Sequence, residues 1–366
     1  MTDVGPGVES PSAPRRYRLD QWLNVGLWIL AVVFVFGVAY FGYTVYLDRQ
    51  SQNGSSAAER IAISLESQVR KSPNDAILRV RLGEALGAEA KYPQAIEQLN
   101  AALKIDPQHS GALYDLGTIA MMTKKYSEAE AYFTKVVSVT EASQYANIDP
   151  LREQALYNLG LLALNDNNYS QAAGYFKASI ALRNDASDTY YQLAHALNGL
   201  GDTDGAIQQL EMALQFDPNY PDVYYFMGQL YQKKHDDVNA SYDFAKAASL
   251  APTAPQPKQA LAAFGTAASW VSKAQTAKAA GDIETALTDV LVARNLDAKS
   301  VVAAELHGDI LVQRGDPKDA LDVYRQALAL DPKNAEIQGK IAQVTPAAKA
   351  AAAAAAAKAA KSKKKK

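Results

Sequence analysis

Cysteine is absent from this 366-residue chain, and histidine occurs only four times. The first absence excludes disulfide scaffolds, thiol catalysis and metal sites with cysteine ligands. No histidine has a neighbour at metal-ligand spacing, and we expect no metal and no cofactor. The chain also lacks a phosphate-binding glycine loop, an H-E-x-x-H motif and a G-x-S-x-G motif. We therefore predict no catalytic residues and a protein that is not an enzyme.

Net charge is small, at −2, but it is unevenly distributed. Seven lysines lie from Lys349 to Lys366, so the rest of the chain is mildly acidic. The alanine- and lysine-rich tail, 346–366, has no large apolar residue and cannot bury a core. Clustered lysines attract anionic lipid or an anionic polymer. The alternative is a solvated tail without a fixed partner, and nucleic acid is the weaker candidate because no aromatic residues are interleaved.

Charged residues are also missing from Gln21 to Leu47. A helix of this length rises roughly 40 Å, which exceeds the thickness of about 30 Å of a hydrocarbon core. Tryptophans lie toward one end of the run and tyrosines toward the other, as expected at the two membrane interfaces. A cleaved signal peptide would have a shorter apolar run and a small-residue cleavage site. We predict a disordered segment over 1–18 and a transmembrane helix over 19–48.

Arginines flank this helix on both sides and bear on its orientation. Three precede it, at 15, 16 and 18, and two follow it closely, at 49 and 60. By the positive-inside rule this balance favours a cytoplasmic N-terminus and places the remainder of the chain outside the cytoplasm. We predict a single-pass protein of the cell membrane; the opposite topology is the alternative.

The remainder of the chain repeats itself. The stretch ALYDLGTIA at 112–120 returns as ALYNLGLLA at 155–163. Small residues, most of them preceded by Leu or Met, recur along the chain, and four of the six steps between them have the same length. These small residues are Gly83, Gly117, Gly160, Ala194, Gly228, Ala274 and Gly308. An alanine stands at the twelfth position after each of them, and a large apolar residue stands at the sixteenth.

This pattern resembles the tetratricopeptide repeat (TPR) family, whose helix–turn–helix unit of about 34 residues carries small and large residues in this order. Asp-Pro closes several units, at 106–107, 217–218 and 331–332, because the residue before proline is disfavoured in a helix. The resemblance covers seven units over 76–334. It implies an all-α fold, a right-handed TPR superhelix (α-solenoid) in which neighbouring repeats stabilise one another.

Departures from the period set the other boundaries. Three prolines over 252–257 interrupt the rhythm after the fifth unit. We predict repeats 1–5 over 76–252, a proline-rich hinge and helix extension over 253–266, and repeats 6–7 over 267–334. The first helix of repeat six is expected to run from about Lys258 past Trp270. A lead-in helix over 49–75 and a capping helix over 335–345 flank the array, since such arrays need polar ends.

The resemblance also implies a binding groove, into which the second, fifth, ninth and twelfth positions of each first helix point. Tyrosine holds the fifth position in four consecutive repeats, at Tyr114, Tyr157, Tyr191 and Tyr225. Tyrosine is a favoured anchor because it offers an apolar face, one polar tip and little rotamer entropy to lose. The predicted groove also includes Gln154, Asp188, His195, Asn198, Asp222 and Gln229. The alternative is that these rings only pack against the next repeat.

From these features we predict a membrane-anchored TPR scaffold that binds a partner protein or peptide in its groove. Assembly, secretion or maturation of envelope proteins is the setting that this layout favours. The alternative is a cytoplasm-facing membrane receptor or adaptor, whose basic tail contacts anionic lipid or ribosomes.

Overall fold

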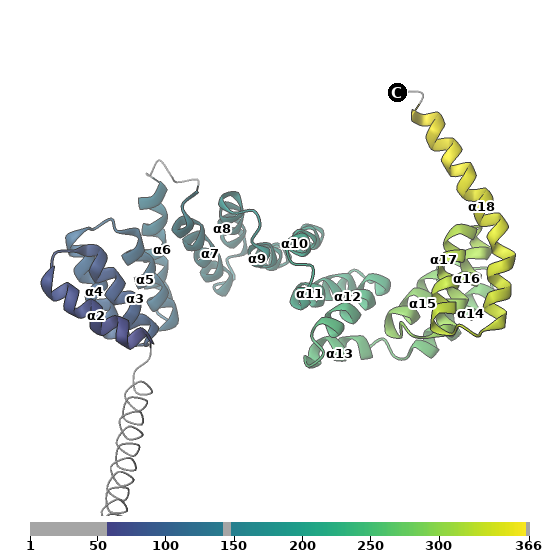
Figure 1. Ribbon diagram of the computed structural model, residues 1–366, viewed down its shortest axis with the longest axis horizontal. Helices are drawn as coiled ribbons and strands as arrows, with labels where there is room; N and C mark the ends of the chain where they lie inside the picture. The colour runs from purple at the N-terminus through teal and green to yellow at the C-terminus, as the bar shows by residue number, and fades with distance from the viewer. Residues whose placement is uncertain (1–56, 142–147, 364–366) are drawn as a thin grey trace, which may run out of the picture. The chain divides into compact units, whose positions relative to one another are not determined.

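A computed structural model describes residues 57–141 and 148–363, and within these ranges all regular structure is helical (Figure 1). The chain divides into two compact units at Lys124 and Lys125. The segments predicted over 1–18 and 19–48 lie outside the described residues. None of the described helices is long and apolar enough to cross a membrane.

The first unit contains the lead-in helix, both helices of repeat one and the first helix of repeat two. Helix α2 falls within the range predicted for the lead-in helix and precedes the first repeat. The unit consists of α2 (Ala57–Lys71), α3 (Ala76–Ala88), α4 (Tyr92–Ile105) and α5 (Ser110–Met122).

The second unit contains the remaining repeats and the C-terminal helix. Its first half consists of α6 (Tyr126–Glu141), α7 (Pro150–Asn165), α8 (Tyr169–Leu182), α9 (Ser187–Gly199), α10 (Thr203–Phe216), α11 (Pro221–Lys233) and α12 (Asp237–Leu250). Its second half consists of α13 (Pro255–Ala262), α14 (Ala267–Ala279), α15 (Ile283–Leu296), α16 (Val301–Arg314), α17 (Pro317–Leu330) and α18 (Ala335–Lys363). The first helices of repeats three, four and five are therefore α7, α9 and α11.

The two helices of a repeat meet at the predicted small position. A Cβ atom added at Gly160 would lie 2.5 Å from Cε1 of Phe176, and one added at Gly308 would clash in the same way with Cε1 of Tyr324. Each large residue stands at the sixteenth position after its glycine, as the period predicted. The seven alanines at the twelfth position after the small residues are all fully buried. Close approach of the helices thus requires the small residue, and the predicted helical repeats are confirmed.

Each first helix ends at a residue in the left-handed backbone region, always at the seventh position after the small residue. The φ values lie between 55° and 60° at Ala90, Lys124, Asn167 and His235. Glycine takes this position in the other three repeats, with φ values of 82° to 92°. This conformation costs a residue other than glycine roughly 1–2 kcal/mol, and the stacked repeats impose it. His235 therefore forms part of a turn.

The region predicted as a hinge is folded onto its neighbours. Helix α13 packs against α12, and α12 packs against α15. The side-chain amide of Asn295 in α15 donates to the carbonyl oxygen of Val238 and to the hydroxyl of Ser241, both at 3.0 Å. Ser241 is fully buried. The proline-rich stretch thus lies in a packed junction inside the second unit.

The prediction of one long first helix from Lys258 past Trp270 is wrong. The chain leaves the helical path at Gly265, where φ is +86°, and α14 follows Thr266, whose side chain accepts from the backbone N–H of Ser269. The indole N–H of Trp270 then donates to the carbonyl oxygen of Phe264 at 2.7 Å. A glycine followed by a capping residue ends one helix and starts another.

Helix α18 differs from the capping helix expected over 335–345, because it continues through Pro346 to Lys363. Val344 and Ala348, on either side of the proline, are both buried in the cluster that contains Tyr324. Packing on both sides holds the helix together across the proline despite the lost backbone hydrogen bond. Alanine and lysine favour helix in the part that follows.

Candidate functional site

The four predicted tyrosines are all half-buried on first helices. Tyr114 lies on α5 in the first unit, and the other three lie on α7, α9 and α11 in the second. The ring of Tyr157 contacts Phe176 of its own repeat, with ring centroids 5.8 Å apart. The Tyr225 ring lies 5.7 Å from that of Phe244 in the same way. One side of each of these two rings therefore packs inside the repeat, as the alternative supposed, and part of each side chain stays accessible.

A cluster of aromatic rings lies on α9, on α11 and at the residue before α11. It is here called the α9–α11 aromatic surface and consists of the half-buried Tyr191, His195 and Tyr220 over the buried ring of Phe226. The centroid of Tyr191 lies 4.6 Å from that of His195, 5.4 Å from Tyr220 and 6.1 Å from Phe226. The imidazole of His195 stacks on Phe226 at 4.0 Å, with 7° between the planes. Contacts between the two helices hold the rings in fixed positions, so the surface is organised before any partner arrives.

Polar groups border this surface. The hydroxyl of Tyr220 donates to Oδ1 of Asp188 at 2.8 Å. At the other end of the helices, the ammonium of Lys233 donates to Oδ1 of Asn198 at 3.4 Å. The structure thus connects Asp188 and His195 through Tyr191 and Tyr220, and it places Asn198 at the far end of α9.

The electrostatics of the surface are set by burial and by carboxylates. Burial raises the pKa of Tyr191, and the negative charge of Asp222 raises it further. Burial lowers the pKa of His195, so the imidazole is neutral at pH 7. The aromatic surface is accordingly uncharged and has carboxylates at its border.

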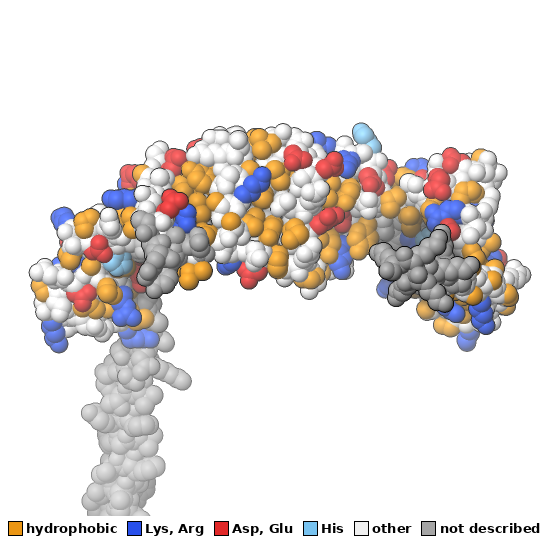
Figure 2. All heavy atoms as spheres, turned by 90° about the horizontal axis from the view of Figure 1, so that it is seen from above, with side chains coloured by type: hydrophobic (Ala, Val, Ile, Leu, Met, Phe, Trp, Pro, Cys, Tyr) orange, Lys and Arg blue, Asp and Glu red, His pale blue; other side chains and the backbone are white. Residues whose placement is uncertain are grey.

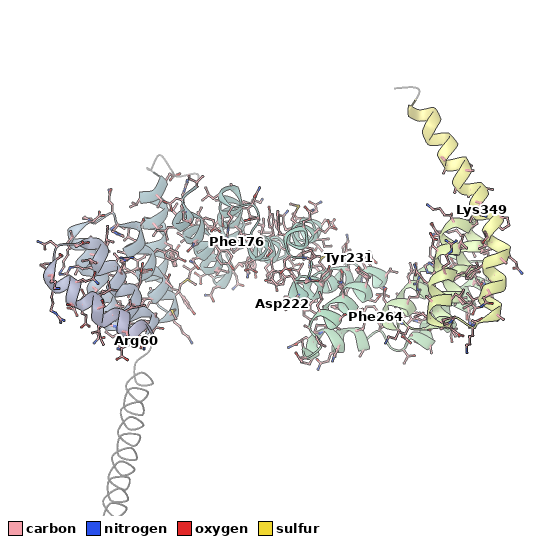
Figure 3. All side chains as sticks on the ribbon, in the orientation of Figure 1. Arg60, Phe176, Asp222, Tyr231, Phe264 and Lys349 are labelled. Carbon is pink, nitrogen blue, oxygen red and sulfur yellow. The ribbon has the colours of Figure 1, made fainter. Side chains whose placement is uncertain are left out.

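The other predicted residues are exposed and make no ring contact with the cluster. Gln154 lies on α7, and Asp222 and Gln229 lie on α11. Figure 3 shows Asp222 near the start of α11 and Tyr231 near its end. On the face seen in Figure 2, hydrophobic side chains are interspersed with charged ones.

Sequence reasoning missed Tyr220 and Phe226. Tyr220 precedes Pro221 and lies just before α11, where the backbone is extended, with φ −88° and ψ 97°. A residue before proline is restricted to this region, which turns the ring back toward α9. The Tyr-Pro pair was the available signal, but Tyr220 stands outside the positions assigned to the groove.

A hollow lies among α14, α16, α17 and α18. It has a volume of about 670 Å³, and Lys278, Asp309, Tyr324 and Lys340 are among the residues that line it. The Lys340 ammonium lies 2.9 Å from Oδ1 of Asp309, and the Tyr324 hydroxyl donates to the same oxygen at 2.6 Å. These charges are already paired inside the fold. Among the described residues, no group of three or more His, Asp or Glu side chains is arranged to hold a metal ion.

Comparison with protein families identifies the repeats. Residues 80–147 and 138–189 match the family described as tetratricopeptide repeat, and residues 196–234 and 308–345 match the family described as TPR repeat. Together these ranges cover just over half of the chain.

Similarity to individual proteins is confined to parts of the chain. Over 78 residues it is 32% identical to the peroxisomal targeting signal receptor of Saccharomyces cerevisiae, across 21% of this chain and 13% of that protein. Over 82 residues it is 29% identical to the ancillary SecYEG translocon subunit of Neisseria gonorrhoeae, across 22% of this chain and 37% of that protein. The chain thus spans well under half the length of these relatives.

Two solved structures resemble parts of the fold. YrrB, a TPR protein with an unusual peptide-binding site, aligns with a TM-score of 0.47 and 21% identity, over 54% of this chain and 98% of its own. PilF of Pseudomonas aeruginosa aligns with a TM-score of 0.48 and 20% identity, over 59% of this chain and 91% of its own.

Proposed function

The chain belongs to the tetratricopeptide repeat family, and from this premise we propose that it is a scaffold that holds a segment of a partner protein on the α9–α11 aromatic surface. The observation that carries the proposal is the ring cluster itself. Tyr191 and Tyr220 are half-buried, so part of each ring remains accessible while the rest is held by neighbouring rings. Fixed aromatic rings bind with little loss of rotamer entropy.

The spacing of first helices suits an extended ligand. Neighbouring helices pack at roughly 8–10 Å, and an extended chain advances about 3.3 Å per residue. An extended segment would therefore bring about every third side chain to the next first helix. Tyr157, Tyr191 and Tyr225 hold the same position in the consecutive first helices α7, α9 and α11, which supports a strand-like partner segment.

We further propose that residues 21–47 anchor the chain in the cell membrane and that the repeats lie outside the cytoplasm. The uncharged run and the flanking arginines support this arrangement. A role in assembly, secretion or maturation of envelope proteins then fits the partial similarity to a protein described as an ancillary subunit of a translocon.

The runner-up is a cytoplasm-facing receptor or adaptor, which the lysine-rich C-terminus favours because it would meet the anionic inner leaflet or ribosomes. The absence of native cysteine allows a direct test. A cysteine replacing Ser362 would react with a membrane-impermeant maleimide in intact cells or spheroplasts only if the repeats lie outside. Labelling restricted to lysed cells would select the receptor.

The binding role is tested by site-specific photo-crosslinking in the native cell. A crosslinking amino acid replaces Gln229 on α11, and Gln208 on α10 serves as the control position, since both are exposed. We expect adducts from the first position only. Replacing Tyr157 and Tyr191 with alanine should reduce these adducts at least about tenfold, as expected on losing anchors worth about 2 kcal/mol.

Tyr175→Ala provides the matched control, because Tyr175 is a half-buried tyrosine on the second helix α8. It should leave the adducts unchanged. Circular dichroism of each variant checks the fold. Full adduct yield in the Tyr157 and Tyr191 variant would contradict the proposal, and collapse of helicity would support the packing alternative instead.

A further inference from the structure

The α9–α11 aromatic surface has carboxylates at its border, and neither α9 nor α11 places a cation beside them. Asp188 is the second residue of α9 and Asp222 is the second residue of α11, and both are exposed. Helix α9 contains neither lysine nor arginine. The one basic residue of α11 is Lys233, at its last position, and its ammonium donates to Asn198.

Neither carboxylate is neutralised within the described part of the chain, where the ion pairs include neither residue. Asp188 accepts one hydrogen bond, from the neutral hydroxyl of Tyr220. That bond orients the carboxylate and leaves its charge in place. Two negative groups therefore lie beside accessible aromatic rings.

The charge of these carboxylates reaches the rings. Burial raises the pKa of Tyr157, and the charge of Asp188 raises it further; Asp222 acts in the same way on the pKa of Tyr191. His195 is neutral and does not offset this field. Aromatic faces are themselves attractive to cations, so rings and carboxylates favour the same kind of ligand group.

The chain shows twice how it holds a lysine. The ammonium of Lys273 lies 3.7 Å from the ring centroid of Trp270. In the last repeat, the fifth and ninth positions of α16 are Glu305 and Asp309, and the ammonium of Lys340 from α18 lies 2.5 Å from Glu305 and 2.9 Å from Asp309. Tyr191 and His195 occupy these same two positions in α9. A basic side chain thus already lies against the corresponding face of another repeat.

We propose that the partner segment presents an arginine or lysine to the α9–α11 aromatic surface, with its charged group between Asp188 and Asp222 and its aliphatic stem over the ring of Tyr191. This inference rests on the proposed protein-binding function and adds the chemistry of the residue that is recognised. Charge complementarity selects a basic segment over an acidic one, which the two carboxylates would repel.

The test uses the full-length chain in detergent with tyrosine rings labelled with carbon-13. The probes are the acetylated and amidated peptide Ala-Ala-Arg-Ala-Ala and its isostere with citrulline in place of arginine, which removes only the charge. Ring signals are assigned with Tyr191→Phe and Tyr220→Phe. We expect both rings to shift, with a dissociation constant at least about tenfold lower for the arginine peptide than for the citrulline peptide.

Replacing both Asp188 and Asp222 with asparagine should make the two peptides bind equally. The matched control is Asp185→Asn, which removes an exposed carboxylate from the turn before α9 and should keep the difference. Equal binding of the two peptides to the unaltered chain would overturn the inference while leaving the protein-binding role intact. No shift of either ring at millimolar peptide would also overturn it, and the crosslinking experiment decides the binding role separately.

Discussion

In repeats three to five, the fifth position of each first helix is a half-buried tyrosine, whereas in the last repeat the same position is Glu305, bound by Lys340 of α18. The first arrangement leaves aromatic area accessible. In the second arrangement, Lys340 pairs with the acidic face of the last repeat within the fold, as the end of a stacked array requires. One helical scaffold thus supports an accessible face and a closed one, and the side chains at two positions decide between them.

A buried carboxylate and a half-buried one show the same contrast. Asp243 on α12 is almost fully buried, and burial raises its pKa to about 7, with Asp236 and Glu211 adding to the shift. Burial alone would also raise the pKa of Asp309 on α16. Hydrogen bonds from Tyr324 and Lys340 outweigh it, so the pKa of Asp309 lies below its ordinary value. A nearby cation therefore determines whether the surroundings of such a carboxyl group favour its ionised or its neutral form.

The largest effect is expected when the closed face loses its cation. Lys340→Met should lower the free energy of unfolding by about 2 kcal/mol, because Glu305 and Asp309 are left partly buried without a partner. Urea denaturation of the full chain measures it. The control, Lys233→Met, alters an exposed lysine at the last position of α11 and should change stability by less than about 0.5 kcal/mol. An equal loss of stability in the two variants would contradict the expected difference between Lys340 and Lys233.

The buried Asp243 and the half-buried Asp309 should give opposite pH dependence. Because the folded pKa of Asp243 is about 7 and its unfolded value is about 3.9, the folded state holds a proton that the unfolded state has lost between these values. Its contribution to stability therefore rises as pH falls from about 7 to about 4. Asp243→Asn should reduce this slope and raise stability at pH 8 by about 1 kcal/mol or more. Part of the slope will remain, since burial and Glu84 raise the pKa of Asp115 to about 7 as well.

Asp309 should act in the other direction. Its lowered pKa stabilises the fold above the unfolded value of about 3.9, and this contribution is lost as pH falls further. Asp309→Asn should therefore be less stable than the unaltered chain at pH 7, and the difference should shrink as pH falls below about 3.9. Unfolding curves from pH 3 to pH 8 measure both acids, and parallel curves for the two variants would refute the contrast.

The smallest effect is expected at the tail. Residues 351–356 are exposed, so deletion of 351–366 should change the free energy of unfolding by less than about 0.5 kcal/mol. Deletion from 347 should cost more, because Ala348 is buried against the last repeat. A loss of several degrees in melting temperature from the shorter deletion would show that the exposed part stabilises the fold.

The repeats could be predicted because the residues that define each one lie close together in sequence. Gly160 and Phe176 stand at a fixed spacing inside one repeat, and each groove tyrosine holds the same position within its own repeat. The packed junction at α12 and α15 could not be predicted, because Asn295 and Ser241 are far apart in sequence and follow no period. Tyr220 was missed for a related reason. It precedes the first helix of its repeat, and its ring contacts Tyr191 of the preceding repeat.

The seam between the two helices of a repeat has a consequence for how such a chain can change over generations. Gly308 and Tyr324 both belong to one repeat, as do Gly160 and Phe176. Duplication or deletion of one whole repeat in the gene therefore adds or removes both members of the pair together, and no residue remains without its packing partner. The array can grow or shrink by whole repeats without remaking its interior, whereas a change to one member of a pair alone demands a matching change in the other.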